Sequence, residues 1–233
     1  MRLAIISDIH ANLEALTSAF EMIAAEHVDA AICLGDTVGY GANPNECLDL
    51  VRTRCFTVLL GNHDNAAFDL SVAERFTHNA QLSARWTFEA ITEDNRSFLR
   101  GLVPAMHWEG LMLAHASPNE PEEWNYIISE SDARDAFRAF DERICFVGHS
   151  HVPVIFSEHG RASALDNNNR YLINVGSVGQ PRDRNPKLSF GIFDTVAWTY
   201  QNVRVQYDIG TASGKIREAG LPVSLADRLS LGV

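Results

Sequence analysis

The sequence lacks a hydrophobic run long enough to cross a membrane, although 46% of its 233 residues are hydrophobic. A membrane-spanning helix needs about 20 consecutive apolar residues. The apolar run at residues 3–6 is also shorter than the core of a signal peptide, and it leads directly to Asp8 and His10. We therefore expect a globular protein that is not exported and does not associate with a membrane.

Cysteine is scarce as well. The four cysteines are Cys33, Cys47, Cys55 and Cys145, and no two of them form a Cys-x-x-Cys pair. In a chain of this length without an export signal, this pattern predicts reduced structural thiols rather than a disulfide framework. The predicted location is the cytoplasm.

Basic residues are outnumbered, with 19 Lys and Arg against 30 Asp and Glu, and the formal net charge is −11. A surface that acidic repels polyanions, so binding to a nucleic-acid polymer is not expected. A small phosphorylated substrate is still compatible with this charge, because bound metal ions reverse the local field. The sequence indicates no particular oligomeric state.

The first third of the chain alternates between strand and helix signals. Apolar runs at residues 3–7, 30–34 and 56–60 predict buried strands. Asn12 is placed to cap the helix after the first strand, and Pro44 suits the first turn of the helix after the second. Because strands and helices alternate with short loops, we predict right-handed crossovers and a parallel sheet.

The remainder is predicted to contain a helical region and several short strands. Residues 80–99 look helical, with Leu82, Trp86 and Ala90 on one face. Strands are expected at residues 111–114, 144–147, 152–156, 171–175, 188–194 and 198–207. The pattern is typical of a layered α/β fold with either two sheets or one mixed sheet. We place one domain at residues 1–208 and a C-terminal extension of two short helices, packed on it, at residues 209–233.

Five short polar motifs follow predicted strands. They are Asp8-Ile9-His10, Gly35-Asp36, Gly61-Asn62-His63-Asp64, His115 and Gly148-His149-Ser150-His151. Side chains two apart on a strand point to the same side, so Asp8 and His10 are expected to grip one ion together. Ligands collect at the carboxyl ends of strands in open α/β sheets, so all five motifs should converge on one rim.

The motifs supply nitrogen and oxygen donors but no thiolate. The candidate metal ligands are Asp8, His10, Asp36, Asn62, His115, His149 and His151. One ion does not need so many protein ligands, and two ions that share a carboxylate would use them economically. Mixed imidazole and carboxylate ligation suits Mn, Fe, Zn or Ni better than Ca or Mg. We predict two divalent ions per chain, with Mn as the first candidate.

These motifs, in this order, resemble those of the calcineurin-like metallophosphoesterases. The resemblance covers residues 3–181, and the segment Asn-Val-Gly-Ser-Val-Gly-Gln-Pro-Arg at residues 174–182 is similar to the small bacterial and archaeal phosphodiesterase branch. The resemblance implies a four-layer αββα sandwich, in which two mixed β-sheets are flanked by helices. It also implies hydrolysis of a phosphoester by a hydroxide that two metal ions activate.

By the same resemblance, three ligands hold each ion and one carboxylate, that of Asp36, bridges them. The first ion would be held by Asp8, His10 and His151, and the second by Asn62, His115 and His149. His63 would donate a proton or a hydrogen bond to the leaving oxygen, and Asp64 would orient His63. A histidine with a pKa near neutrality can perform that role.

Several of these residues also have ordinary structural interpretations. Asp64 could simply cap the next helix. Tyr40 either lines the site or packs over it. Ser177 and Arg182 either reach a phosphate or belong to a surface turn built on Pro181. No substrate-binding residue is assigned from the sequence.

The leading functional prediction is hydrolysis of a small phosphodiester or phosphomonoester. One alternative is a hydrolase of dinucleoside polyphosphates. Another is a protein phosphatase, which the lack of an arginine-rich patch in the motif segments disfavours. A third, from a different class, is a non-enzymatic scaffold of the same fold. The complete ligand set and the intact His63 argue against the scaffold.

Overall fold

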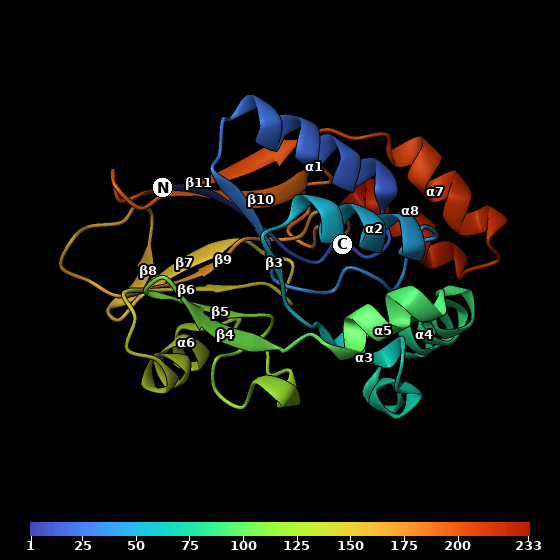
Figure 1. Cartoon of the computed structure of the whole chain (residues 1–233), viewed down its shortest axis with the longest axis horizontal. Coiled ribbons are helices and arrows are strands. Elements are labelled where there is room, and N and C mark those ends of the chain that lie inside the picture. Colours follow the sequence, from blue (N-terminus) through green and yellow to red (C-terminus); the bar gives the residue numbers. More distant parts are fainter.

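The computed structural model describes all 233 residues, and its framework is two β-sheets packed face to face (Figure 1). The first sheet contains β1 (Arg2–Ile6), β2 (Ala30–Cys33), β3 (Thr57–Val58), β10 (Leu188–Asp194) and β11 (Thr199–Val205). The second contains β4 (Ala105–Trp108), β5 (Leu111–Ala114), β6 (Ile144–Val147), β7 (Val154–Ser157), β8 (Gly160–Ala162) and β9 (Tyr171–Asn174). The strand orders are β11-β10-β1-β2-β3 and β4-β5-β6-β9-β7-β8.

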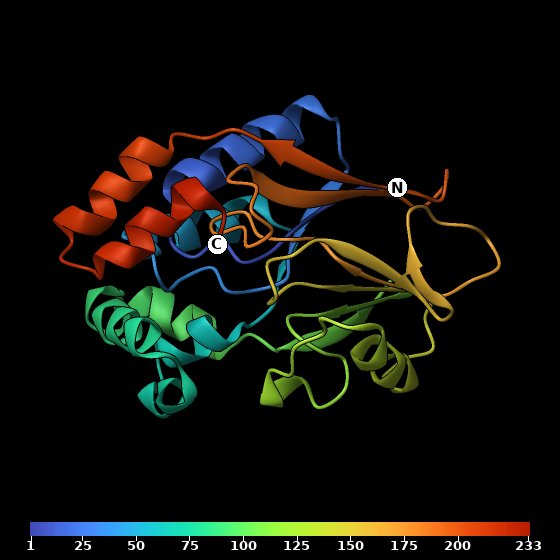
Figure 2. The same cartoon turned by 180° about the vertical axis from the view of Figure 1, so that it is seen from behind.

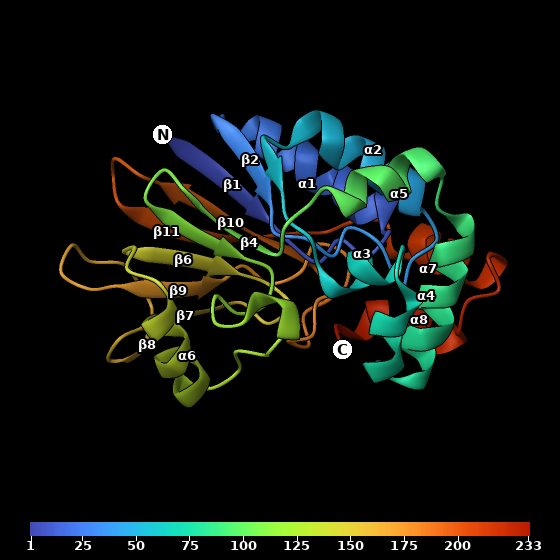
Figure 3. The same ribbon diagram turned by 60° about the horizontal axis from the view of Figure 1, so that its bottom comes forward.

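Both sheets are mixed. The strands β1, β2 and β3 pair in parallel, as predicted, whereas β10 runs antiparallel to β1 and to β11. In the second sheet β5, β6 and β9 are parallel, and β4, β7 and β8 are antiparallel to their neighbours. Figure 3 shows the two sheets one above the other.

The helices form the outer layers. They are α1 (Leu13–Ala25), α2 (Pro44–Arg54), α3 (Asn62–Ala66), α4 (His78–Ala90), α5 (Glu93–Arg100), α6 (Glu130–Ala136), α7 (Ile209–Glu218) and α8 (Val223–Leu231). Short 3-10 segments lie at Leu70–Arg75, Pro121–Glu123 and Phe137–Ala139. As predicted, Asn12 caps α1 by accepting the Ala15 N–H at 3.1 Å, and Pro44 begins α2.

The apolar core follows the strand alternation and produces the four layers. On β1, Leu3 and Ile5 face the second sheet, whereas Ala4 and Ile6 face α1. Strand β5 alternates in the same way between the space separating the sheets and the face covered by α6. Side chains therefore fill three stacked interfaces, and the expected αββα sandwich is confirmed.

Residues 80–99 are mostly helical, as predicted, but they are divided between two helices, α4 and α5. Thr92 caps the second by accepting the Asn95 N–H at 3.3 Å. Leu82 does not lie on the buried face of α4, because it is 42% exposed. The buried face carries small residues, namely Ala80, Ser83, Ala84 and Thr87. Small side chains let α4 approach the main chain closely, and the Ser83 hydroxyl accepts the Tyr40 N–H.

The two C-terminal helices pack on each other beside α4, at one end of the sandwich (Figures 1 and 2). Their buried face surrounds Tyr40 and Ala80. The chain turns between α7 and α8 at Gly220, which has a positive φ of 69°. None of the helices is both long and apolar enough to cross a membrane.

Candidate metal centre

All five polar motifs converge on one rim of the sandwich, and both sheets contribute. Asp8 and His10 follow β1, Asp36 follows β2, and Asn62 begins α3 just after β3. His115 follows β5, and His149 and His151 follow β6 of the second sheet. Each of these predicted ligands is at most 6% exposed. The site is therefore a buried set of polar groups that needs internal partners or cations.

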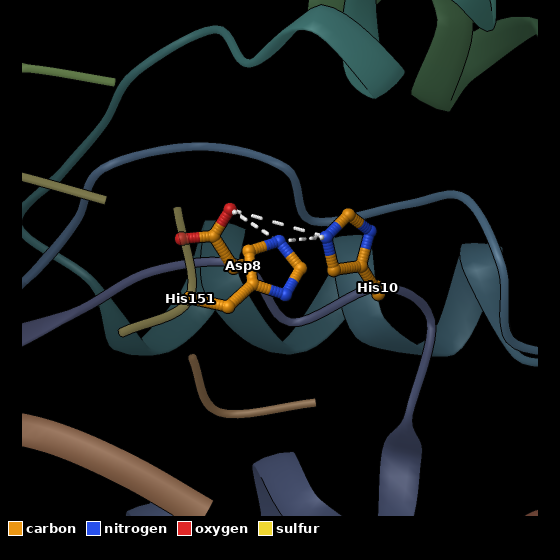
Figure 4. A group of neighbouring side chains, drawn as sticks. All are labelled: Asp8, His10 and His151. Carbon is orange, nitrogen blue, oxygen red and sulfur yellow. Dashed lines mark hydrogen bonds and ion pairs between the residues drawn. The ribbon is translucent and has the colours of Figure 1, made fainter. Parts of the chain in front are cut away.

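The first group contains Asp8, His10 and His151, whose ligand atoms all lie within 4.8 Å of one another (Figure 4). Asp8 Oδ1 is 3.3 Å from His151 Nε2 and 3.9 Å from His10 Nε2. The two Nε2 atoms face each other at 3.1 Å. Two imidazole nitrogens and one carboxylate oxygen in this arrangement form three donors for one metal ion.

The second group contains Asp36, His115 and His149, also within 4.8 Å of one another. Asp36 Oδ2 lies 3.4 Å from His115 Nε2 and 3.7 Å from His10 Nε2. Asp36 therefore contacts a member of each group. Its carboxylate therefore lies within reach of the donors of both groups.

Main-chain carbonyl groups fix which ring nitrogen faces the centre. Three histidines direct Nδ1 at a carbonyl oxygen: His10 at Val38 (3.1 Å), His115 at Leu34 (3.0 Å) and His151 at Gln180 (2.6 Å). A carbonyl oxygen only accepts hydrogen bonds, so each Nδ1 carries the hydrogen. Each Nε2 is then the atom that faces the other ligands and can bind a metal ion once it carries no proton.

Ten side-chain nitrogen or oxygen atoms are buried without a hydrogen-bond partner, and four of them belong to predicted metal ligands. These four are Asp8 Oδ1, Asn62 Oδ1, His115 Nε2 and His149 Nε2. Leaving a buried polar atom unsatisfied costs about 1–3 kcal/mol, and such atoms are rare in native proteins. These unpaired donor atoms therefore fit divalent cations. Asn62 counts among the possible ligands because its Oδ1 atom is buried without a partner.

The charges of the ligands also suit cations. Burial by itself would raise the pKa of Asp36, but the adjacent His115 and His63 rings hold it well below its usual value. Burial lowers the pKa of His149 to about 3 and that of His10 well below its usual value. At neutral pH these groups are therefore a carboxylate and neutral imidazoles, which are the ligating forms.

The local backbone differs from the expected strand geometry. Five ligands have positive φ between 51° and 64°: Asp8, His10, Asp36, His149 and His151. They lie beyond the strand ends, so strand alternation is the wrong reason for their convergence. Left-handed turns redirect each side chain instead, and His149 and His151 join different groups. Such backbone conformations are unfavourable for residues other than glycine and cluster at functional sites.

Hydrogen bonds between neighbouring loops hold these turns in place. The Asp8 N–H donates to Gly35 O and the His10 N–H donates to Asp36 O, both at 3.0 Å. Asp8 Oδ2 accepts the His149 N–H at 2.9 Å, which leaves Oδ1 for the centre. A methyl group on Gly148 would lie 2.5 Å from that Oδ2 atom, so this approach requires glycine.

His63, in the first turn of α3, forms a third group with His10 and Asp36, whose ligand atoms also lie within 4.8 Å of one another. Its ring centroid is 5.1 Å from that of His10, 4.3 Å from that of Tyr40 and 4.6 Å from that of Phe76. Its Nδ1 is buried without a partner. Burial lowers the pKa of His63 to about 4, so the ring is neutral at pH 7 and carries one N–H.

Both carboxylate oxygens of Asp64 accept main-chain N–H groups. Its Oδ1 accepts the Val38 N–H at 3.0 Å and its Oδ2 accepts the Gly61 N–H at 3.1 Å. No hydrogen bond joins Asp64 to the His63 ring, so the orienting role that the resemblance implies stays a prediction. Asp64 closes the start of α3 and joins it to the loop after β2, which is the capping interpretation.

Two open interpretations are resolved by contacts. Tyr40 lines the site, because its ring centroid lies 4.6 Å from that of His10 and its ring also packs on His63. Ser177 is structural, because its hydroxyl donates to Asp8 O at 2.7 Å and accepts the Gln180 N–H at 2.7 Å. It thus supports the turn that carries Asp8.

A cavity of about 890 Å³ opens beside the centre. Asn62, His63 and His149 are among its lining residues. Its other lining residues include the aromatic side chains of Tyr40, Phe76, Trp124 and Tyr126 and the cationic side chains of Arg75, Arg182 and Arg228. No sequence pattern indicated Trp124, Tyr126 or Arg228, because none of them belongs to a motif.

Comparison with known proteins shows the family of the chain. Residues 1–197 match the calcineurin-like phosphoesterase superfamily domain, so the chain belongs to that superfamily. An uncharacterized protein of Methanocaldococcus jannaschii is 40% identical, with 99% of this chain and 98% of the relative covered.

Solved structures agree in fold. A metallophosphoesterase from Sphaerobacter thermophilus is 39% identical and superposes with a TM-score of 0.90, covering 100% of this chain and 99% of its own. A hypothetical protein from Pyrococcus horikoshii is 20% identical, with a TM-score of 0.82 and coverage of 100% and 98%. At that lower identity the second likeness shows the fold alone.

Proposed function

We propose that the protein is a phosphoesterase that hydrolyses a small phosphodiester at a centre of two divalent metal ions. The observation that carries the proposal is the position of Asp36. Its carboxylate contacts His10 of one ligand group and His115 of the other. Membership of the calcineurin-like phosphoesterase superfamily supports the reaction class.

Asp8, His10 and His151 would hold one ion, Asn62, His115 and His149 the other, and Asp36 would lie between them. When bound, two divalent ions lower the pKa of a water molecule and neutralise charge on the phosphoryl oxygens. Two carboxylates balance only part of the charge of two such ions. Asn62, as a neutral ligand, preserves the remaining positive charge for the phosphoryl group.

The chain's own residues would then bind the substrate and hydrogen-bond its leaving oxygen. His63 has a ring N–H to offer to that oxygen, and the rings of Tyr40 and Phe76 hold its imidazole in place. A pKa of about 4 leaves this ring neutral at pH 7, so the arrangement favours a hydrogen bond to the leaving oxygen over transfer of a proton from an imidazolium.

The proposal also covers the size of the substrate, the identity of the metal and the location of the protein. The cavity of about 890 Å³ and the net charge of −11 favour a small substrate over a nucleic-acid polymer. The mixture of imidazole, carboxylate and amide ligands favours Mn, with Fe, Zn or Ni as alternatives. Four free cysteines support a reducing location such as the cytoplasm.

A metal-reconstituted hydrolysis assay tests the proposal. The protein would be stripped with a chelator, reloaded with Mn, Fe, Zn, Ni or Mg, and assayed on bis-p-nitrophenyl phosphate beside p-nitrophenyl phosphate. Metal-dependent cleavage of the diester is the expected result. Cleavage of the monoester alone would replace the diesterase by a phosphatase. Inactivity on both substrates, with two ions bound per chain, would count against hydrolysis of simple phosphoesters.

A further inference from the structure

Two arginine side chains meet at the edge of the cavity. Arg182 and Arg228 both donate from Nη2 to the Oε1 atom of Gln180, at 3.1 Å for Arg182. Both guanidinium groups also lie over the ring of Tyr40, with Cζ at 5.9 Å and 4.5 Å from its centroid. The side-chain oxygen of Gln180 and the ring of Tyr40 therefore hold two positively charged groups close together.

Neither Arg182 nor Arg228 forms an ion pair with a carboxylate, although the protein is rich in Asp and Glu. By contrast, Arg204 pairs with Asp183 and Arg217 pairs with Asp227. The Nε atom of Arg228 is buried without any hydrogen-bond partner. Burial and the neighbouring Arg182 lower the pKa of Arg228, as expected when like charges approach each other.

The C-terminal helix holds Arg228 at this position. The Arg184 N–H donates to Gly232 O at 2.8 Å, which ties the end of α8 to the loop that carries Arg182. Asn79 of α4 donates from Nδ2 to the Ser224 hydroxyl at 2.8 Å and fixes the start of α8. The superfamily match ends at residue 197, so the chain adds Arg228 from outside the matched region.

Gln180 connects the arginine pair to the metal centre. Its main-chain oxygen accepts Nδ1–H of His151, and its side-chain oxygen accepts from both arginines. The Tyr40 ring beneath the pair lies 4.6 Å from the His10 ring, between their centroids. A single residue therefore lies between the arginine pair and each of two predicted ligands of the same ion. Gln180 connects the pair to His151, and Tyr40 connects it to His10.

We propose that Arg182 and Arg228 form a clamp for a second anionic group of the substrate, beside the phosphoester that is hydrolysed. This inference rests on the proposed function and narrows its substrate class. The substrate is a phosphoester with an arm that ends in a carboxylate or a second phosphate. Guanidinium groups match both anions through paired N–H donors, and an anion between them relieves their mutual repulsion.

Matched substrates test the clamp. p-Nitrophenyl alkyl phosphate diesters with arms of equal length, ending in a methyl group, a carboxylate or a phosphate, would be compared on the metal-loaded protein. We expect kcat/KM to be at least 10-fold higher with an anionic arm, mainly through KM. In Arg228→Met and Arg182→Met this preference should fall by about 10- to 100-fold. Methionine keeps apolar contact with Tyr40 while removing the charge.

Arg217→Met is the matched control, because Arg217 lies on α7 in the same C-terminal segment but outside the cavity. It should keep the preference for an anionic arm. Preference for the carboxylate or for the phosphate arm would identify the second group. A wild-type protein without any preference, or an Arg228→Met variant that keeps it, would overturn the clamp.

Binding measurements separate failure of the clamp from failure of the proposed function. Non-hydrolysable phosphonate analogues with the same arms would be titrated into the metal-loaded protein by calorimetry. Tighter binding of the anionic arm that Arg228→Met abolishes supports the clamp even if no diester is hydrolysed. Diester hydrolysis without any binding preference would leave the proposed function intact and refute the clamp.

Discussion

The α-carbon of Gly39 faces the His63 ring so closely that a methyl group on it would lie 2.5 Å from Nδ1 of the ring. Gly39 also has a positive φ of 87°, a conformation that residues with a side chain rarely adopt. The loop after β2 thus leaves room for the imidazole, which Tyr40 and Phe76 hold from other sides. Glycine at this position is part of what positions His63.

Replacing Gly39 by alanine should displace the His63 ring and strain the loop. We expect turnover of the diester to fall by at least about 10-fold, because small misplacements of a catalytic group are costly. The bound metal should stay at the wild-type content, because Gly39 contributes no ligand. Steady-state kinetics and metal analysis of the same preparation check both points.

Gly214→Ala is the matched control for that substitution. Gly214 lies within α7, and a methyl group added there would meet nothing within 4 Å. Alanine at this position should raise helix stability by about 0.5–1 kcal/mol and leave turnover unchanged. Wild-type turnover in Gly39→Ala would show that the close approach does not position His63.

Removing the imidazole of His63 should lower turnover by about 10²–10⁴-fold while both metal ions stay bound. His63 is not among the atoms proposed as ligands, so metal content is not expected to change. The loss should be largest for diesters with poorly acidic leaving groups, since the negative charge on their leaving oxygen gains most from a hydrogen bond. Turnover of His63→Ala would be measured over a series of leaving groups, beside His159→Ala, which changes an exposed turn. Equal losses across the series would show that His63 does not assist the leaving group.

Asp36→Asn should release both metal ions together. Asp36 Oδ1 also accepts the main-chain N–H of His63 at 2.8 Å. The side-chain oxygen of asparagine can keep this hydrogen bond while the negative charge is lost. We expect affinity for both ions to fall by more than about 100-fold. Metal content per chain after dialysis measures this, with the surface variant Asp166→Asn as control. Retention of one ion at full occupancy would contradict a bridging carboxylate.

The sequence predicted the sheets well because their strands are continuous apolar runs. The run at residues 188–194 matches β10 residue for residue. By contrast, β4 and β8 were not predicted, since Ala105–Trp108 and Gly160–Ala162 are short and show no apolar alternation. Edge strands of this kind form because a neighbouring strand offers free main-chain groups, which a local pattern does not reveal.

The ligand residues were predictable from type and order, but their geometry was not. Asp8 and His10 converge through left-handed turns that only contacts between loops can fix. The role of Asp64 depends on which N–H groups lie nearby, and one of them belongs to Val38 in a different loop. Arg228 is about 46 residues beyond Arg182 and reaches the same cavity only because α8 folds back on α4.

Metal binding should release a proton at neutral pH, and His115 should be its source. Burial would lower the pKa of His115, but the Asp36 carboxylate 3.4 Å away raises it to about 9 in the metal-free protein. A pKa raised above neutrality means that the ring is protonated at pH 7 and must lose that proton to become a ligand. The lowered pKa of His10 and of His149 means that these rings have no proton to release.

Affinity for the ion that His115 binds should therefore rise by about tenfold per pH unit between pH 7 and the pKa near 9, and level off above it. Calorimetric titration with metal in buffers of different ionisation enthalpy counts the released protons directly. His115→Ala should abolish the release, whereas His159→Ala should not. Metal binding at pH 7 without proton release would mean that His115 is already neutral, and that the Asp36 charge is compensated from elsewhere in the centre.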